Sequence, residues 1–259
     1  MRLLRPVLFL ILTIPVGLRP EGLCHAQTDG SRFLRWAGQD AAGLGRVALQ
    51  RAPAAAGAAT AFIVGSSKVD PVLNDDIRAW STGSVGRFLD GTNPLGGPRV
   101  AAPAVGIFGL SLLLGDERSQ DAAFTSLEAV VYAGALAYGI KYSLGRGRPL
   151  DGFSASHFAP FSGNTSFPSG HTTTAFALIT PWVLYYNTPL ARSLFLLPVG
   201  TALARMDRDR HWATDVLAGG ALGILTARYL VQRHTGRANS NRRSRVRVTP
   251  GGASLQFWF

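Results

Sequence analysis

The sequence predicts an all-α protein with about six core helices, and two observations support this fold class. Long apolar stretches recur along the chain, and polar segments separate them. Glycine and alanine are frequent within the stretches, whereas the β-branched alternation typical of half-buried strands is absent. The chain has 259 residues, enough to bury one hydrophobic core. The expected helices cover residues 52–65, 100–114, 122–140, 172–186, 193–204 and 216–231.

The N-terminus has the features of an export signal. Two arginines precede an apolar run over residues 7–18, and Ala26 offers a small residue for cleavage. An uncleaved membrane anchor fits the same pattern, so residues 1–26 are expected to be a signal peptide or an N-terminal anchor. The only cysteine, Cys24, lies inside this segment, so the mature protein is expected to contain no disulfide.

Residues 27–99 are expected to form an N-terminal helical region. Apolar residues recur at mildly amphipathic spacing over 33–49, which favours a helix packed on the core over an interfacial membrane helix. The helix expected over 52–65 follows. A connection rich in glycine, aspartate and serine, residues 68–99, then leads to the next apolar stretch.

The C-terminal residues 233–259 are expected to form a basic tail that ends in a small hairpin or in a loosely ordered segment. Six arginines lie between positions 233 and 247 without an acidic residue among them. A basic segment beside a membrane fits this better than nucleic-acid binding, because no recognition motif accompanies it. Beyond it, residues 245–249 and 253–259 alternate around a Pro-Gly-Gly turn, which predicts two paired strands.

Three short motifs carry side chains that together suit one phosphate site. Their lysine and arginines match a tetrahedral oxyanion, since guanidinium groups present forked donors. Their two histidines offer a nucleophile and a proton donor that work near neutral pH, and the carboxylate can orient one imidazole. The motifs are Lys141-x6-Arg148-Pro149, then Pro168-Ser169-Gly170-His171, then Arg205-x5-His211-x3-Asp215.

Each motif alone also has an ordinary structural interpretation. The first motif is typical of a basic helix end. A single histidine such as His171 is usually a packed side chain. A pair four residues apart, such as His211 and Asp215, usually forms a hydrogen bond at the surface. Outside the motifs, we expect Arg146 and residues 207–210 to be solvated. We place His157 in the loop before the second motif and His234 in the basic tail.

In order and with these gaps, the motifs resemble the signature of the type 2 phosphatidic acid phosphatase (PAP2) superfamily. That group includes lipid phosphatases, bacterial class A acid phosphatases and vanadium haloperoxidases. The resemblance covers residues 100–232 and implies a PAP2-type helical bundle with its catalytic core there. One departure is Ala204, where the family usually has serine; it removes one hydroxyl contact but no core catalytic side chain.

The resemblance also implies a role for each motif residue. His211 would be the nucleophile, Asp215 would orient it, and His171 would protonate the leaving group. The phosphate would be bound by Lys141, Arg148, Ser169, Gly170 and Arg205.

The implied function is a metal-independent phosphatase that cleaves a phosphomonoester or pyrophosphate, most simply of an envelope lipid, through a phosphohistidine. No cofactor is expected, because no Cys/His/Asp cluster has metal-ligand spacing. The expected partner is a phosphorylated lipid or a small phosphate ester, and nucleic acid is not expected; the oligomeric state stays open. The alternatives are a soluble periplasmic acid phosphatase of broad specificity, a vanadium-dependent haloperoxidase and a non-catalytic membrane protein.

Membrane association is expected, although the number of spans stays open. A span needs about 20 apolar residues, and most of the apolar stretches are shorter. If the basic tail is cytoplasmic, the positive-inside rule places His211 and Asp215 on the outer side of the membrane. The expected location is therefore the inner membrane with a periplasm-facing site, or the periplasm.

Overall fold

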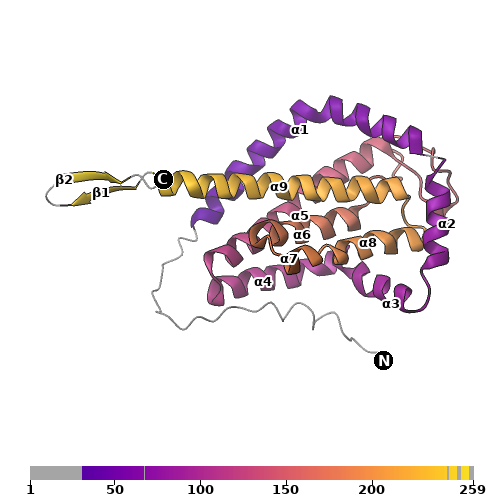
Figure 1. Cartoon of the computed structure of the whole chain (residues 1–259). Helices are drawn as coiled ribbons and strands as arrows, with labels where there is room; N and C mark the ends of the chain where they lie inside the picture. Colours follow the sequence, from indigo (N-terminus) through magenta and orange to yellow (C-terminus); the bar gives the residue numbers. More distant parts are fainter. Residues whose placement is uncertain (1–30, 67, 244, 250–251, 257–259) are drawn as a thin grey trace.

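The computed structural model describes residues 31–66, 68–243, 245–249 and 252–256. The expected signal peptide or anchor over residues 1–26 lies outside this part. The described chain is helical except for one C-terminal hairpin, which confirms the expected all-α class (Figure 1). Its α-helices are α1 (Ser31–Ser66), α2 (Asp70–Trp80), α3 (Gly83–Thr92), α4 (Ala101–Leu114), α5 (Glu117–Leu144), α6 (Gly170–Tyr186), α7 (Pro189–Ser193), α8 (Leu196–Asp207) and α9 (Ala213–Arg243). Short 3-10 turns are η1 (Asn93–Gly96), η2 (Pro98–Val100) and η3 (Pro149–Asp151).

All six apolar stretches lie in helices, with two differences from expectation. The segments 33–49 and 52–65 form one continuous helix, α1. The polar connection 68–99 is mostly helical and contains α2 and α3. Pro71 occupies the first turn of α2, where its missing N–H leaves no hydrogen bond unmade.

Helix α6 is the centre of the bundle and contacts α5, α8 and α9. Small side chains make these contacts close: one core cluster consists of Ala129, Ala133, Ala177 and Ala227 with Leu230. On α9, a β-carbon at position 223 would lie 2.5 Å from the carbonyl oxygen of Thr173 on α6, so only glycine fits there. The alanine- and glycine-rich pattern therefore brings these helices into close contact.

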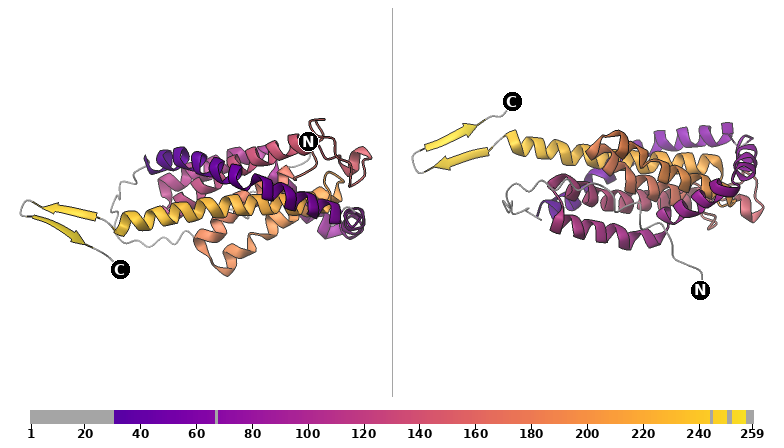
Figure 2. Two further views of the ribbon diagram at one scale, coloured as in Figure 1. Left: turned by 90° about the horizontal axis from the view of Figure 1, so that it is seen from above. Right: turned by 60° about the horizontal axis from the view of Figure 1, so that its bottom comes forward.

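The three motifs meet at one end of the bundle, next to α2 (Figure 1). Helices α5 and α8 end there, and α6 and α9 begin there. The opposite end of α9 leads to the hairpin, in which β1 (Arg245–Thr249) pairs antiparallel with β2 (Gly252–Gln256) (Figure 2). This pairing confirms the expected hairpin.

Two helices of the described part are long and apolar enough to cross a membrane: α5, and α9 over Ala213–Gly236. The pair Gly83–Gly96 and Pro98–Leu114 passes the same test together but is bent by 70°, so it would count as a third, broken span. Large apolar side chains are exposed on these segments, among them Leu113, Leu114 and Leu225. Such exposure suits a membrane or another apolar partner.

Candidate active site

The ends of four helices position the motif side chains. Lys141 lies in the last turn of α5 and Arg205 in the last turn of α8. Ser169 is the N-cap of α6, so Gly170 and His171 begin that helix. Asp215 lies in the first turn of α9, and His211 lies in the loop just before it. The segments that carry the eight predicted site residues therefore meet at one end of the bundle.

The three motif cations are held by neutral groups. Lys141 Nζ donates to the carbonyl oxygens of Thr165, at 2.7 Å, and of Pro168. Arg148 Nη2 donates to Thr165 Oγ1 at 2.8 Å, and Arg205 Nη1 donates to Asn93 Oδ1 at 3.3 Å. Among the described residues, none of these cations forms a salt bridge with a carboxylate. They therefore keep their charge available for an anion.

Several buried nitrogens of the site also indicate that it is suited to an anion. Within the described part of the chain, Arg148 Nε, Arg205 Nε and His211 Nδ1 are buried and have no hydrogen-bond partner. Buried polar groups without a partner are rare in proteins and costly. An oxyanion that accepts from the two guanidinium groups would satisfy two of these nitrogens.

Helix α6 adds a neutral anion cradle to these charges. Ser169 Oγ accepts from Thr172 Oγ1 at 2.9 Å, which leaves the Ser169 proton to donate. The amide of Gly170 lies at the helix N-terminus, where N–H groups and the helix dipole favour an anion. Ala204, at the position where the family usually has serine, is fully buried in α8.

The pKa values of the site reflect burial and like charge. Burial, and then the nearby cations Arg205, Lys141 and Arg148, lower the pKa of His171 to about 4. Burial also lowers the pKa of His211 to about 4, against the opposing effect of Asp215. The pKa of Arg205 falls to about 10, through burial and then the neighbouring arginines, and Arg205 stays charged at pH 7. Both imidazoles are therefore neutral at pH 7 in this structure.

The carboxylate of Asp215 is fully buried and held by three donors. Its Oδ2 accepts from the Trp212 backbone N–H at 2.9 Å and from Ser166 Oγ, and its Oδ1 accepts from Arg146 Nη1 at 2.6 Å. His211 Nδ1 lies 3.6 Å from Oδ2, which is too long for a hydrogen bond. Such base–orienter contacts are often long without substrate and tighten when it binds.

The prediction that Arg146 is solvated is wrong. Its side chain is fully buried, and besides Asp215 it donates to Thr214 Oγ1 at 2.6 Å and to Asp70 Oδ2 at 2.7 Å. Its guanidinium also donates to the carbonyl oxygen of Ala155. The basic turn concealed this role because Asp70 lies 76 residues away in the sequence.

Helix α2 supplies two more positioning residues that the motif analysis missed. Asp70 accepts from the Thr214 backbone N–H at 2.9 Å, at the start of α9. Asn74 Nδ2 donates to the carbonyl oxygen of His211 at 2.9 Å. Their spacing of four residues places both on one helical face, and this was the available signal in the polar connection.

A cavity of about 340 Å³ adjoins the residues predicted to bind phosphate. Lys141, Gly170 and His171 line it, together with an apolar face of α5 that begins at Val130. From Val130 to Lys141 this face is about 16 Å long. The remaining α5 residues of the lining are Gly134, Ala137 and Tyr138.

Residues at the junction of η1 and η2 line the other side of the cavity. A β-carbon at position 96 would lie 2.2 Å from the carbonyl oxygen of His171, so the approach of η1 to α6 requires Gly96. His157 does not line this cavity; it stacks on Phe153 with ring centroids 4.3 Å apart.

The lowered imidazole pKa values predict that the protein loses stability in mild acid. Above pH 6.5 the histidines are neutral in both the folded and the unfolded chain, so they add no pH dependence. Between pH 6.5 and about 4 the unfolded chain binds protons that the folded one excludes, so the free energy of unfolding falls as the pH falls. For buried His211 this slope approaches about 1.4 kcal/mol per pH unit. When the free energy of unfolding is measured with denaturant from pH 7 to pH 4, it should depend less steeply on pH in His211→Asn than in the unmodified protein. An equal slope in the two proteins would contradict the lowered pKa of His211.

Comparison with known proteins agrees with this geometry. Residues 122–238 match the model of the PAP2 superfamily. The lipid A 1-phosphatase of Porphyromonas gingivalis is 44% identical over 91 residues, which cover 33% of this chain and 18% of the relative. The lipid A 1-phosphatase of Rhizobium johnstonii is 37% identical over 108 residues, which cover 38% of this chain and 43% of the relative.

Each alignment therefore spans less than half of the relative. Among solved structures, the crystal structure of Aquifex aeolicus LpxE aligns with 20% sequence identity and a TM-score of 0.47, covering 63% of this chain and 95% of that chain. The match to the family model thus supports, over residues 122–238, the PAP2 resemblance that the three motifs predicted.

Proposed function

We propose that the protein is a phosphatase that hydrolyses a phosphomonoester of an envelope lipid without a metal ion in the reaction. One observation carries this proposal: Lys141, which has no carboxylate partner in the described chain, lines a cavity with Gly170 and His171, and the rest of the lining is mostly apolar. A phosphate group at the polar end of an apolar molecule suits such a pocket. The PAP2 match and the relatives named lipid A 1-phosphatases support the same substrate class.

Binding would depend on complementary charge. Lys141, Arg148 and Arg205 would bind the phosphate oxygens, with Ser169 Oγ and the Gly170 N–H as neutral donors. These groups are held in place before the substrate arrives, so they stabilise the charge of the transition state without reorganising. In many other phosphotransferases metal ions perform this task.

The first chemical step would be attack by His211. Its Nδ1 faces Asp215, so Nε2 is the nucleophilic atom, and His211 is neutral at pH 7. As the P–N bond forms, the P–O bond to the leaving group breaks, and His171 donates a proton to the departing oxygen. The phosphate dianion raises the pKa of His171 from its low value, which prepares it as an acid.

In the second step water would attack the phosphohistidine. Neutral His171 accepts a proton from this water as the P–N bond breaks. Inorganic phosphate leaves, and His211 returns to its neutral form. His171 takes up one proton from solvent when the phosphate dianion binds and returns one to solvent when inorganic phosphate leaves, so each histidine ends the cycle as it began.

The bundle also supports a membrane location. The proposed site lies at the start of α9, whereas the arginine-rich segment follows from its far end (Figure 1). A helix of 31 residues is about 46 Å long, enough to separate the two sides of a bilayer. With the basic end in the cytoplasm, the site would face the periplasm.

A substitution in the apolar wall tests the substrate class. Gly134 lines the cavity on α5, and a β-carbon there meets nothing within 4 Å. We expect Gly134→Leu to lower kcat/KM for a lipid phosphate in mixed micelles at least tenfold, because the new side chain would occupy the apolar part of the cavity. For a small soluble phosphate ester, kcat/KM of the variant should stay within twofold of that of the unmodified protein.

Gly139→Leu is the matched control, because Gly139 lies on the same helix in open space and does not line the cavity. It should leave both rates unchanged. Equal losses on both substrates in Gly134→Leu would contradict a lipid-binding wall. Faster turnover of soluble esters by the unmodified protein would favour the soluble acid phosphatase instead.

Substitution of the nucleophile tests the mechanism. His211→Ala should lower kcat by about 10⁴-fold or more, because no other side chain replaces the attacking nitrogen. Phosphate release from a lipid phosphate measures this. His157→Ala, in a loop outside the cavity, should keep its activity, and substantial activity of His211→Ala would refute the assignment.

Arg146 is expected to act by positioning Asp215. Arg146→Lys keeps the charge but loses the fork that joins Asp215 to Asp70, so kcat should fall about 10- to 100-fold with KM changed less than threefold. Steady-state kinetics of the folded variant checks this. The control Arg208→Lys alters an exposed ion pair with Asp90 and should behave as the unmodified protein. A change in KM alone would contradict the positioning role.

A further inference from the structure

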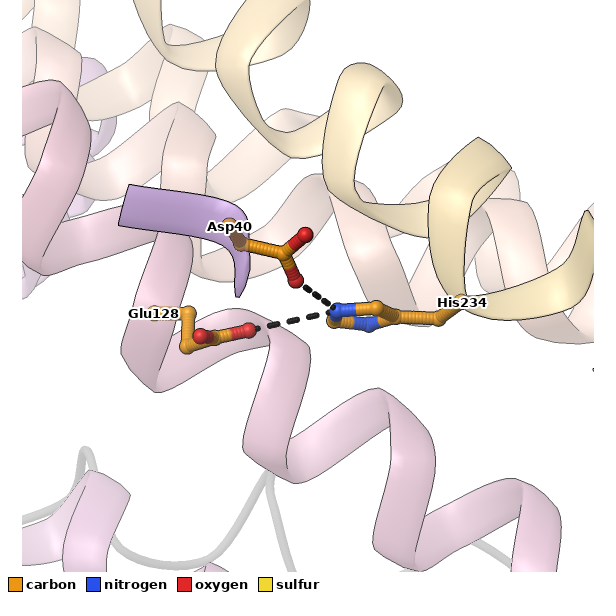
Figure 3. A group of neighbouring side chains, drawn as sticks. All are labelled: Asp40, Glu128 and His234. Atoms are coloured by element: carbon orange, nitrogen blue, oxygen red, sulfur yellow. Dashed lines mark hydrogen bonds and ion pairs between the residues drawn. The ribbon is translucent and has the colours of Figure 1, made fainter. Parts of the chain in front are cut away.

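A second cluster of ionisable side chains lies inside the bundle. It consists of Asp40 on α1, Glu128 on α5 and His234 on α9, which point toward one another (Figure 3). His234 Nε2 lies 2.7 Å from Asp40 Oδ2 and 3.3 Å from Glu128 Oε2. All three residues are buried, and one ligand atom from each lies within 4.8 Å of the other two.

The structure corrects the placement of His234 in the basic tail. This residue belongs to α9, and its side chain is 1% exposed. The cluster has no recognisable spacing in the sequence, because Asp40 and His234 are 194 residues apart.

The hydrogen bonds around the cluster leave Nε2 as the nitrogen that faces both carboxylates. Thr125 Oγ1 donates its one proton to the carbonyl oxygen of Asp121 at 2.6 Å. His234 Nδ1, 2.9 Å from the same Oγ1, must therefore be the donor in that contact. Metal-binding histidines typically donate their second ring N–H in this way.

The charge of the cluster calls for a cation. Two carboxylates in a helical core are costly unless positive charge compensates them. Arg233 Nε donates to Asp40 Oδ1 at 2.7 Å, which leaves Asp40 Oδ2 directed at the cluster. One imidazole nitrogen and two carboxylate oxygens suit zinc, iron(II) or manganese(II), and metal sites of this composition occur in the cores of helical bundles.

We propose that Asp40, Glu128 and His234 bind one divalent transition-metal ion, which ties α1 to α5 and α9. Its role is structural. Along α5, Glu128 lies about 20 Å from Lys141, and along α9, His234 lies about 28 Å from Asp215. The ion therefore does not contact the phosphate site, and the proposed reaction does not depend on it.

Metal content and stability of the full-length protein test this proposal. Protein purified in detergent without chelators should contain about one equivalent of zinc, iron or manganese per chain by mass spectrometry. After removal of the metal with EDTA, saturating Zn²⁺ or Mn²⁺ should raise the Tm by about 5 °C or more. Phosphatase activity measured well below the Tm should not change with the metal, which separates this test from that of the proposed function.

Variants locate the ion. His234→Gln and Glu128→Gln should lose the bound metal and its effect on the Tm, whereas His157→Gln should keep both. If the two cluster variants fail to fold, the metal content of the unmodified protein alone decides. Absence of metal together with a Tm insensitive to Zn²⁺ and Mn²⁺ would overturn the proposal, as would a metal effect that persists in both variants.

Discussion

The buried carboxylate of Asp215 is the group on which the rest of the site depends. It accepts hydrogen bonds from Arg146, Ser166 and the Trp212 backbone, and the Asp215 carbonyl oxygen accepts from the Ser169 backbone N–H. These bonds join the start of α9 to the start of α6 and, through Arg146 and Asp70, to α2. A buried charge tolerates the loss of a partner poorly, so this network fixes the position of His211 relative to the N-terminus of α6.

Close packing of the helices makes the hydrogen-bond network around Asp215 possible. Alanine and glycine at the contacts of α6 with α5 and α9 bring the ends of these helices close together, so groups from separate helices reach one another. The proposed phosphate-binding cations lie beside neutral acceptors rather than carboxylates, and the cavity extends from Lys141 along the apolar face of α5. A polar site thus adjoins an apolar cavity wall, which suits a molecule with a charged head and an apolar body.

Much of this arrangement could be predicted from the sequence. The predictions that failed concern features that the local sequence pattern does not reveal. The six long helices follow from apolar stretches whose pattern is local, and the motif residues lie together because each sits at a helix end or in a loop next to one. Helices α2 and α3 were missed because they are polar and short. Arg146 and His234 were misplaced because their burial depends on Asp70 and Asp40, which are 76 and 194 residues away. Local pattern indicates which residues are helical, but long-range ion pairs decide which charges are buried.

The most direct test of the account is to trap the covalent intermediate. Protein mixed with a radiolabelled lipid phosphate, quenched with alkali within one turnover and digested, should carry phosphate on a single peptide that contains His211. The label should be stable in alkali and lost in acid, as expected for a phosphorylated imidazole, and His211→Ala should carry none. Rapid turnover with no labelled protein at any time, or label on another residue, would contradict nucleophilic catalysis by His211.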